Sequence, residues 1–493
     1  MKRIKTPPGA KRLIESLRDL GYECSTAIAD LIDNSVSADA SEIFVDIHPK
    51  DGKIPAYIVI ADNGKGIDRR ALYEAMRFGS TQEYDSEDLG KYGLGLKTAS
   101  LSQCRRLTVS SKPRYGKGKR SLRNIVRWDL DRVYEADDWD LLDLDSGDLQ
   151  PWEKEVLNNS LARAHGTVIL WSELGEALPL LSAGDENKRQ RFFARLLEEV
   201  SSHLRMVFHR FMQQKVQGRR KLTIKVGDLR LTPWDPFCID EDKTESLSVK
   251  SLTVGVPGKE AAGATEKVAV SPFILPREDE YSTREAWKNA AGPRGWNQQQ
   301  GLYFYRNGRL LQAGGWSYIR SPDEHTKLLR IAVDFPSDLD TAFSINVTKM
   351  RARIPADIRD ALQTDISKWT QKARAHYDRK ARPSGRGTQT PASPSGAGGS
   401  TKPDPTIRAG GVKLSFEGST SQKFVIQQDS RSGELHVTMP AGHELASWNG
   451  TGKLQDFCMV ALALLEALFQ NRLKPSQIPI IKLKTAFRRV LQE

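Results

Sequence analysis

Ser25-Thr26-Ala27-Ile28-Ala29-Asp30-Leu31-Ile32-Asp33-Asn34-Ser35 is the most informative segment of this chain. Read as a helix, it places Asp30 and Asn34 on one face, one turn apart. A carboxylate and a carboxamide at this spacing can hold a water molecule and a hydrated Mg²⁺ together. An isolated pair of this kind is more often a capping or solvated pair, so its meaning depends on the segments that follow.

Two expected strands come next. Residues 42–48 alternate apolar and other side chains, and residues 56–61 form a short apolar run. The second run ends in Asp62-Asn63-Gly64-Lys65-Gly66, where the glycines allow positive φ and close approach to a ligand. Asp62 offers two acceptor oxygens, and the exocyclic amine of adenine is a suitable donor to them. A hairpin turn is the alternative interpretation of this segment alone.

A glycine-rich segment then leads into another expected helix, Gly90-Lys91-Tyr92-Gly93-Leu94-Gly95-Leu96-Lys97. Free backbone N–H groups and the positive end of the helix dipole favour an anion in front of it, and phosphate is the obvious one. Lys91 and Lys97 add positive charge. Packing of a helix against a strand is the alternative explanation of the glycines.

A fourth segment, residues 166–171, is a β-rich strand that begins with Gly166-Thr167. The Thr167 hydroxyl can join Asp62 in a water-bridged contact to a base. In this order the four segments resemble the N box, G1, G2 and G3 motifs of the GHKL ATPases, which include gyrase B, MutL, the ninety-kilodalton heat-shock chaperones and the sensor histidine kinases. The resemblance implies an α+β Bergerat fold over residues 1–185, with helices on one face of a mixed sheet and nucleotide on the helical side.

The resemblance also implies a role for each matching residue. Asp30 is the general base, Asn34 ligates Mg²⁺, and Asp62 binds the adenine of ATP. Lys97 meets the phosphates and Thr167 supports the base, while residues 78–88 form a lid that closes over ATP. The glycines that shape the pocket and lid are Gly64, Gly66, Gly90, Gly93 and Gly95.

Asp30 departs from the usual motif, which has glutamate at this position. The aspartate side chain is one methylene shorter, and losing about 1 Å of reach can slow hydrolysis on the order of a hundredfold. The sequence therefore favours ATP binding with slow turnover. Glu23, two helical turns earlier, is too distant to replace Asp30 and is better explained as a solvated or capping residue.

The following region, residues 186–380, resembles the ribosomal-S5-like α/β transducer domain of gyrase B, MutL and the microrchidia (MORC) proteins. Residues 187–212 are expected to be helical, and strands are expected at 222–226, 229–232, 252–256 and 267–273. Residues 299–311 have an alternating strand pattern with an Asn307-Gly308 turn. In this family a transducer lysine touches the γ-phosphate, and Lys349 is the candidate here; a solvated loop lysine is the alternative.

A transducer argues against a sensor histidine kinase, and the first motif is most like that of prokaryotic MORC-like proteins. The cysteine-rich CW zinc finger and long heptad segment of eukaryotic MORC proteins are missing. His203 and His209 have no carboxylate or cysteine partner at metal spacing, so packed or surface histidines are expected.

The composition bounds the class of protein. The chain has 493 residues, 39% hydrophobic and 28% charged, which suits about three globular domains. No stretch of about twenty apolar residues occurs, so no membrane partner is expected. The four cysteines have no Cys-x-x-Cys spacing, which favours a reduced, cytoplasmic protein without structural zinc.

A net charge of +12 favours acidic partners, of which double-stranded DNA is the first candidate. Basic clusters lie at 112–123, 219–221 and 482–489, and each taken alone is more often a solvated face. Two protomers clamped around a duplex would join these clusters into one channel, with binding that weakens steeply as salt rises.

The C-terminal part differs in composition. Residues 381–411 are rich in Ser, Pro, Gly and Thr, which is typical of a flexible linker. Residues 412–493 are expected to form a small α+β domain of no recognised family, with strands near 412–416, 424–428 and 434–439 and helices at 454–469 and 479–490. The apolar face of the first helix packs on this domain's sheet or on a protein partner.

The leading hypothesis is a GHKL ATPase of the MORC/MutL clamp type: Mg²⁺-dependent ATP binding forms a homodimer, slow hydrolysis reopens it, and DNA is the cargo, in DNA remodelling or antiviral defence. The alternative is a nucleotide-sensing module that hydrolyses little and regulates a partner enzyme through its C-terminal domain. A folding chaperone is the third option, and the basic charge disfavours it.

Overall fold

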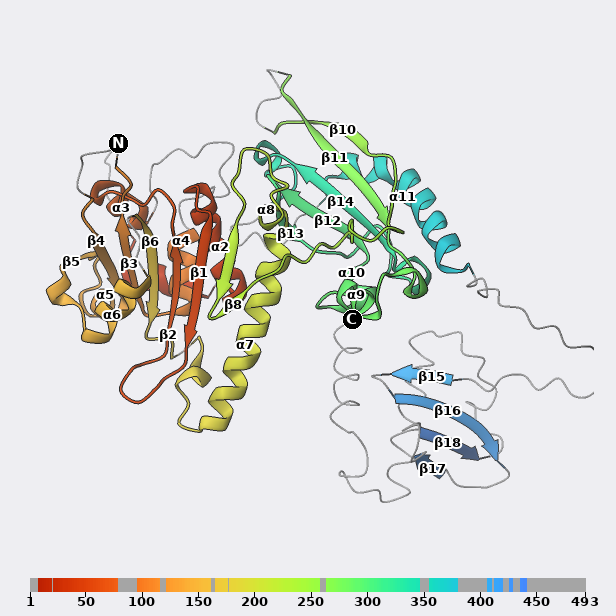
Figure 1. The fold of residues 1–493 in the computed structure, drawn as a ribbon, viewed down its shortest axis with the longest axis horizontal. Coiled ribbons are helices and arrows are strands. Elements are labelled where there is room, and N and C mark those ends of the chain that lie inside the picture. Colours follow the sequence, from red (N-terminus) through yellow and green to blue (C-terminus); the bar gives the residue numbers. More distant parts are fainter. Residues whose placement is uncertain are drawn as a thin grey trace, which may run out of the picture. The chain divides into compact units, whose positions relative to one another are not determined.

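The computed structural model describes residues 8–19, 21–78, 95–115, 121–160, 165–175, 177–257, 263–345 and 354–379, with strand backbones at 406–409, 412–419, 425–428 and 435–440. The chain divides into two compact units, Met1–Pro383 and Ser384–Glu493. The first unit contains two sheets with helices, shown side by side in Figure 1.

The first sheet has eight strands and is antiparallel except for one pair. Its order is β5-β4-β3-β6-β2-β1-β7-β8, and β1 and β7 are the parallel neighbours. Along this order the strands are β5 (Leu142–Leu144), β4 (Asn124–Asp129), β3 (Arg106–Lys112), β6 (Gly166–Ser172), β2 (Tyr57–Asp62), β1 (Glu42–His48), β7 (Thr223–Val226) and β8 (Leu229–Arg230).

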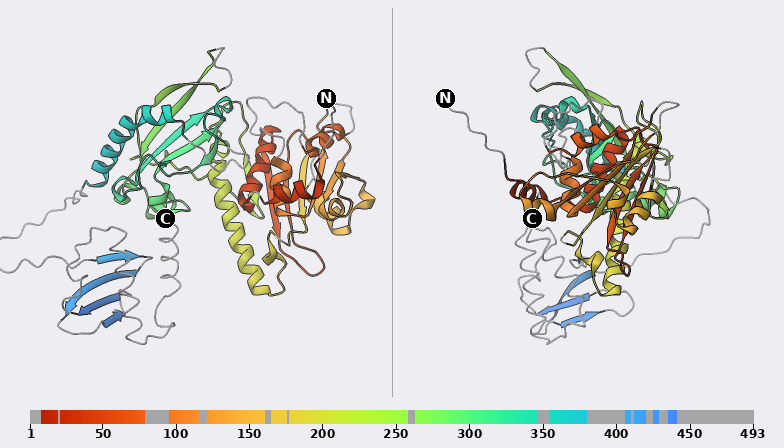
Figure 2. Two further views of the ribbon diagram at one scale, coloured as in Figure 1. Left: turned by 180° about the vertical axis from the view of Figure 1, so that it is seen from behind. Right: turned by 90° about the vertical axis from the view of Figure 1, so that its left-hand side faces the viewer.

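Helices cover the inner face of this sheet, and the main apolar core lies beneath them. The strand β1 turns Ile43, Val45 and Ile47 into that core, as its alternating sequence predicts. Figure 2 shows these helices from two further directions. The helices that contribute to the inner core are α1 (Ala10–Arg18), α2 (Cys24–Ser37), α3 (Arg69–Met76), α4 (Gly95–Gln103), α5 (Leu130–Ala136), α7 (Glu186–Val207) and α8 (His209–Met212).

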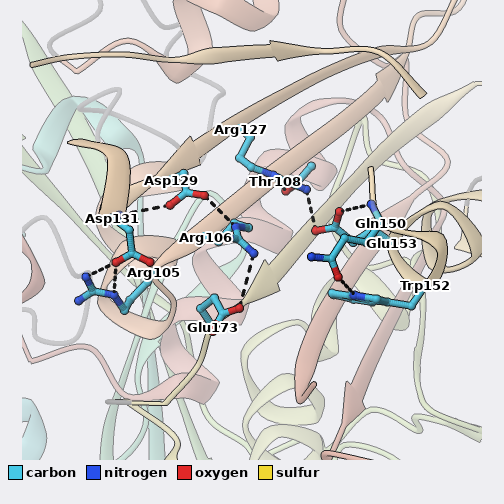
Figure 3. A network of polar contacts seen from close by, with 10 residues as sticks. All are labelled: Arg105, Arg106, Thr108, Arg127, Asp129, Asp131, Gln150, Trp152, Glu153 and Glu173. Atoms are coloured by element: carbon cyan, nitrogen blue, oxygen red, sulfur yellow. Dashed lines mark hydrogen bonds and ion pairs between the residues drawn. The ribbon is translucent and has the colours of Figure 1, made fainter. Parts of the chain in front are cut away.

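The outer face of the sheet is also partly covered, by α6 (Pro151–Ser160). Arg127 of β4 donates to Glu153 Oε1 of α6 at 2.7 Å and to Thr108 Oγ1 at 2.8 Å, and both members of the ion pair are buried (Figure 3). Removing one partner of such a pair typically costs about 3–5 kcal/mol. The apolar run in β2 follows from this cover, because Tyr57, Val59 and Ala61 pack under α6 and cannot alternate with polar residues.

The second sheet of the first unit has the order β10-β11-β14-β12-β13, with β9 pairing with β11. Its β12 and β14 are parallel neighbours, and α11 packs on it. The strands and helices of this part of the chain are β9 (Glu245–Ser246), β10 (Lys250–Gly255), β11 (Thr265–Ile274), α9 (Arg284–Ala290), α10 (Gly295–Gln299), β12 (Gly301–Arg306), β13 (Arg309–Gln312), β14 (Leu329–Phe335) and α11 (Ala356–Tyr377).

The predicted boundary at residue 185 does not separate the two sheets. The strands β7 and β8 come after it in sequence, yet β7 pairs with β1 and completes the first sheet. The helix α7 also comes after it, and packs against α2 as well as against β13 of the second sheet. We therefore describe the first sheet with its helices as the nucleotide module and the second sheet with its helices as the second module.

The second unit is described through its strands alone. A four-stranded sheet has the order β15-β16-β18-β17, with β16 and β18 parallel. Its strands are β15 (Thr406–Ala409), β16 (Val412–Ser419), β17 (Val425–Gln428) and β18 (Leu435–Pro440). The strand β15 lies within residues 381–411, which the sequence assigns to the linker. The helices predicted at 454–469 and 479–490 lie outside the described residues.

Among the described residues, every helix is too short or too polar to cross a membrane.

Candidate functional site

The helix α2 presents the first predicted site residues. Every residue from Cys24 to Val36 is buried except Asn34, which is exposed. Asn34 is therefore the one position in this stretch of α2 whose side chain is accessible to a ligand from solvent. Asp30, one turn earlier, is buried. The two residues share a helix face, as predicted, but differ in accessibility.

Asp30 is held by two hydrogen-bond donors. Arg309 Nη2 of β13 donates to Asp30 Oδ1 at 3.0 Å, and the Tyr22 hydroxyl donates to Asp30 Oδ2 at 3.2 Å. Burial and the neighbouring Asp30 carboxylate raise the pKa of Tyr22, which therefore remains a neutral donor. A carboxylate can accept about four hydrogen bonds, so these contacts fix its orientation without by themselves excluding a water molecule.

Asp62 lies at the end of β2 with its carboxylate hydrogen-bonded on both oxygens. Gly64 N–H donates to Asp62 Oδ1 at 2.8 Å, and the Ser35 hydroxyl donates to Asp62 Oδ2 at 2.9 Å. Burial raises the pKa of Asp62, although these bonds and one from the Thr167 backbone oppose the shift. A half-buried carboxylate of this kind is a strong acceptor for a ligand amine.

Thr167 lies directly opposite Asp62 in the antiparallel pair of β6 and β2. Its hydroxyl is buried and forms a hydrogen bond of 2.9 Å with the Ser111 hydroxyl of β3. The structure therefore brings together Asp62 and Thr167, which are far apart in sequence, and their contact with a base stays a prediction.

Glycine is required at positions 64 and 66, after Asp62, for two different geometrical reasons. Gly66 has φ +65°, and a Cβ added there would lie 2.1 Å from the Lys112 carbonyl oxygen. Gly64 has no positive φ, but an added Cβ would lie 2.8 Å from the Ala38 carbonyl oxygen. Both positions require glycine because the loop passes so close to α2 and β3. Gly95 begins α4, and an added Cβ there would meet nothing within 4 Å.

Lys97 is buried on α4 and faces the end of α3. Its ammonium donates to the carbonyl oxygens of Ala75 and Arg77, both at 2.8 Å. Burial lowers the pKa of Lys97 to about 8. These two contacts use two of the three N–H donors of the ammonium, and its predicted contact with phosphate stays a prediction.

Several predicted site residues lie outside the described residues: Gly90, Gly93 and Lys349, together with residues 79–88 of the lid. Their roles stay predictions.

A cavity of about 750 Å³ lies on the other side of the sheet, between α6 and the outer face of β1, β2 and β7. Among the predicted site residues that the structure describes, Asp62 alone lines it, at one end. The other described site residues belong to the helical side, so this cavity shares only Asp62 with them.

The sequence reasoning missed three site residues, Tyr22, Ser35 and Arg309. Ser35 immediately follows Asn34, and its hydroxyl could have been considered as a donor to Asp62. Arg309 follows the Asn307-Gly308 turn that the sequence did identify. Its contact with Asp30 spans 279 residues, and no sequence spacing indicates it.

The residues present fit ATP and Mg²⁺. Asp62 supplies a half-buried acceptor for the adenine amine, and Gly64 and Gly66 let the loop that follows it pack closely against the neighbouring backbone. Mg²⁺ bound with nucleotides typically takes one or two protein oxygens and completes its shell with phosphates and water. The exposed amide of Asn34 supplies one such oxygen.

The sequence of the first module matches a known protein family. Residues 22–167 match the family described as "Histidine kinase-, DNA gyrase B-, and HSP90-like ATPase". Protein MICRORCHIDIA 6 of Arabidopsis thaliana is 34% identical over 80 residues, which are 15% of this chain and 12% of that protein. The chain thus matches only a small part of that relative's length.

A solved structure titled "Crystal Structure of N terminal domain of a DNA repair protein" is 14% identical. The alignment covers 73% of this chain and 97% of that one, with a TM-score of 0.38. This value is too low to support an argument.

The family match extends from Tyr22, which contacts Asp30, to Thr167, which pairs with Asp62. The two ends of the matched segment are therefore both parts of the candidate site. Residues 22–167 of this chain are therefore similar in sequence to the GHKL ATPases, and an 80-residue segment of the chain is similar to a MORC protein.

Proposed function

We propose that this protein binds ATP with Mg²⁺ and hydrolyses it slowly. The observation that carries the proposal is the pairing of Asp62 with Thr167 beside the glycine loop on the helical side of the sheet. Asp62 accepts the adenine amine, and Asn34 supplies a protein oxygen to Mg²⁺. When bound, Mg²⁺ neutralises part of the charge on the phosphates.

In this proposal Asp30 is the general base that orients a water molecule toward the γ-phosphate. Two features of Asp30 favour a low rate of ATP hydrolysis. The aspartate is shorter than glutamate, and both of its oxygens already accept hydrogen bonds, from Arg309 and from Tyr22. Lys97 and Lys349 are proposed to contact the phosphates.

We further propose that ATP binding joins two protomers into a clamp that acts on double-stranded DNA in the cytoplasm, with defence against foreign DNA as its setting. The net charge of +12 supports an acidic partner. The cluster at 219–221 supports it less, because Arg219 donates to the Val36 carbonyl and Arg220 pairs with Asp39. The C-terminal unit is proposed to bind a protein partner.

Two measurements on the purified chain test this proposal. ATP turnover should rise when duplex DNA is added at low salt, and the rise should vanish at high salt because phosphate contacts release counterions. Sedimentation with a non-hydrolysable ATP analogue should show a dimer that is absent without nucleotide. Monomer in both conditions would contradict the clamp.

A second candidate function is a nucleotide sensor with little or no hydrolysis. The engagement of both Asp30 oxygens by Arg309 and Tyr22 favours it. Single-turnover ATPase of the wild type, Asp30→Asn and Asp30→Glu discriminates the two. No turnover in the wild type favours the sensor, whereas turnover that is lost in Asp30→Asn favours the enzyme.

A further inference from the structure

A tight hairpin of the second module reaches the nucleotide module. The strands β12 and β13 are joined by Asn307 and Gly308, which have φ of 46° and 82°. A Cβ added at Gly308 would lie 2.6 Å from the Val216 side chain, so the turn packs closely against the chain that follows α8. Arg309, the next residue, is therefore held at the contact between the modules.

Arg309 joins two acidic residues of α2. Its Nη2 donates to Asp30 Oδ1 at 3.0 Å, and its Nε donates to Asp33 Oδ1 at 2.6 Å. The side chains of all three residues are at most 3% exposed. One guanidinium from the second module thus fixes two carboxylates of the nucleotide module in the protein interior.

The other groups around this cluster do not replace the guanidinium. Tyr22, before α2, donates to Asp30 and stays neutral. His203 of α7 faces Arg309 and Asp33, and burial lowers its pKa to about 4, so it is uncharged near neutral pH. Arg309 therefore provides the positive charge against Asp30 and Asp33 among these groups.

A buried carboxylate is costly unless a cation or several donors compensate it. Arg309 compensates the buried charge of Asp30 and fixes the direction of its carboxylate. Since Arg309 is anchored in β13, that direction depends on the position of the second module.

We propose that Arg309 is a positioning residue for ATP hydrolysis, which holds the Asp30 carboxylate in place and thereby makes turnover depend on contact between the two modules. This inference rests on the proposed function, in which Asp30 is the general base. Arg309 acts through Asp30 and does not itself touch ATP.

The same hairpin offers a matched control. Arg306 at the end of β12 forms a buried pair with Asp340, with Nε–Oδ1 of 2.7 Å and Nη2–Oδ2 of 3.0 Å. This pair lies wholly within the second module. Loss of Arg306 should therefore cost stability of a similar kind, without moving Asp30.

The experiment compares Arg309→Met with Arg306→Met in the full chain. Arg309→Met should lower kcat on the order of a hundredfold, because a displaced base loses about that much. The KM for ATP and the affinity for a non-hydrolysable ATP analogue should change less than about threefold, since adenine and phosphate contacts remain. Arg306→Met should keep kcat within about threefold of wild type when both are assayed well below their unfolding temperatures.

Two further variants separate positioning from folding. Arg309→Lys keeps the charge but lacks the fork that reaches two carboxylates, so it should retain part of kcat and fold even if Arg309→Met does not. Added guanidinium at low concentration should raise kcat of Arg309→Ala, and it should leave Asp30→Asn unchanged.

The outcomes are distinguishable. Wild-type turnover that survives in Arg309→Met and Arg309→Lys overturns the role of Arg309 and leaves the proposed function standing. An equal loss of kcat in Arg306→Met and Arg309→Met also overturns it, because the effect is then one of general stability. A wild type that binds the analogue but never turns over ATP overturns hydrolysis, and the positioning role with it.

Discussion

Replacing Asp62 with asparagine tests the recognition of adenine at a single atom. The Gly64 N–H can only donate, so the amide oxygen of the new side chain must take the place of Oδ1. The amide NH₂ then occupies the place of Oδ2, where the Ser35 hydroxyl can rotate to accept from it. The adenine amine would meet this NH₂, so that two donors face each other.

The expected loss of affinity for ATP follows from the lost hydrogen bond to the adenine amine. A hydrogen bond to a charged group contributes about 1.5–3 kcal/mol, which corresponds to roughly a 10- to 150-fold weaker Kd for ATP. The substitution should not lower the free energy of unfolding. Burial raises the folded pKa of Asp62 above its unfolded value, so its contribution to stability is present at low pH and lost as pH rises through the folded pKa. At neutral pH, Asp62→Asn should therefore be at least as stable as wild type.

Calorimetric titration with a non-hydrolysable ATP analogue, together with thermal unfolding, measures both effects. Asp46→Asn is the matched control, because Asp46 is a carboxylate of the same sheet whose pKa burial also raises, but it alternates with the core residues Val45 and Ile47 and so lies on the outer face. It should leave the Kd unchanged. An Asp62→Asn protein that binds the analogue within about twofold of wild type would refute this account of adenine recognition.

Asn34→Ala should abolish the Mg²⁺-dependent part of ATP binding, with little change in the free energy of unfolding because Asn34 is exposed. Titrations with ATP in Mg²⁺ and in a chelator measure the Mg²⁺-dependent part, and equal affinities in wild type and variant would contradict the role of Asn34. Gly66→Ala should destabilise the fold by about 2 kcal/mol or more in urea unfolding, since its φ is +65° and the new Cβ meets the Lys112 carbonyl. The control Gly95→Ala should not destabilise, and similar midpoints for both would contradict the loop geometry. The affinity of the wild type for ATP should fall as pH drops through the raised pKa of Asp62, because protonation removes an acceptor of the adenine amine. In Asp62→Asn the affinity should not depend on pH in this range, and a remaining pH dependence would show that another group titrates.

The sequence predicted those strands of the nucleotide module that have a clear apolar pattern or begin at a glycine. The alternation at 42–48 and the apolar run at 56–61 correspond to β1 and β2, and Gly166-Thr167 begins β6. The α+β GHKL fold is confirmed by the family match over residues 22–167. Such elements are predictable because burial of one or both faces imposes its own period on the sequence.

Contacts between distant segments could not be predicted in the same way. The pairing of β7 with β1 moves residues beyond 185 into the first sheet, and no local pattern specifies which edge a short strand joins. The burial of Asp30 against Arg309 and of Lys97 against the end of α3 likewise depends on tertiary packing. Sequence spacing indicated which residue types gather at the site, but not which of them already have partners inside the protein.

A paired titration tests most directly whether the carboxylate of Asp62 selects adenine. The full chain is titrated with non-hydrolysable analogues of ATP and GTP under identical Mg²⁺ and salt. Guanine presents a carbonyl oxygen where adenine presents its amine, so two acceptors would face each other in the site. We expect binding of the ATP analogue and at least about a hundredfold weaker binding of the GTP analogue. Equal affinity for both, or no binding of either, would contradict the account.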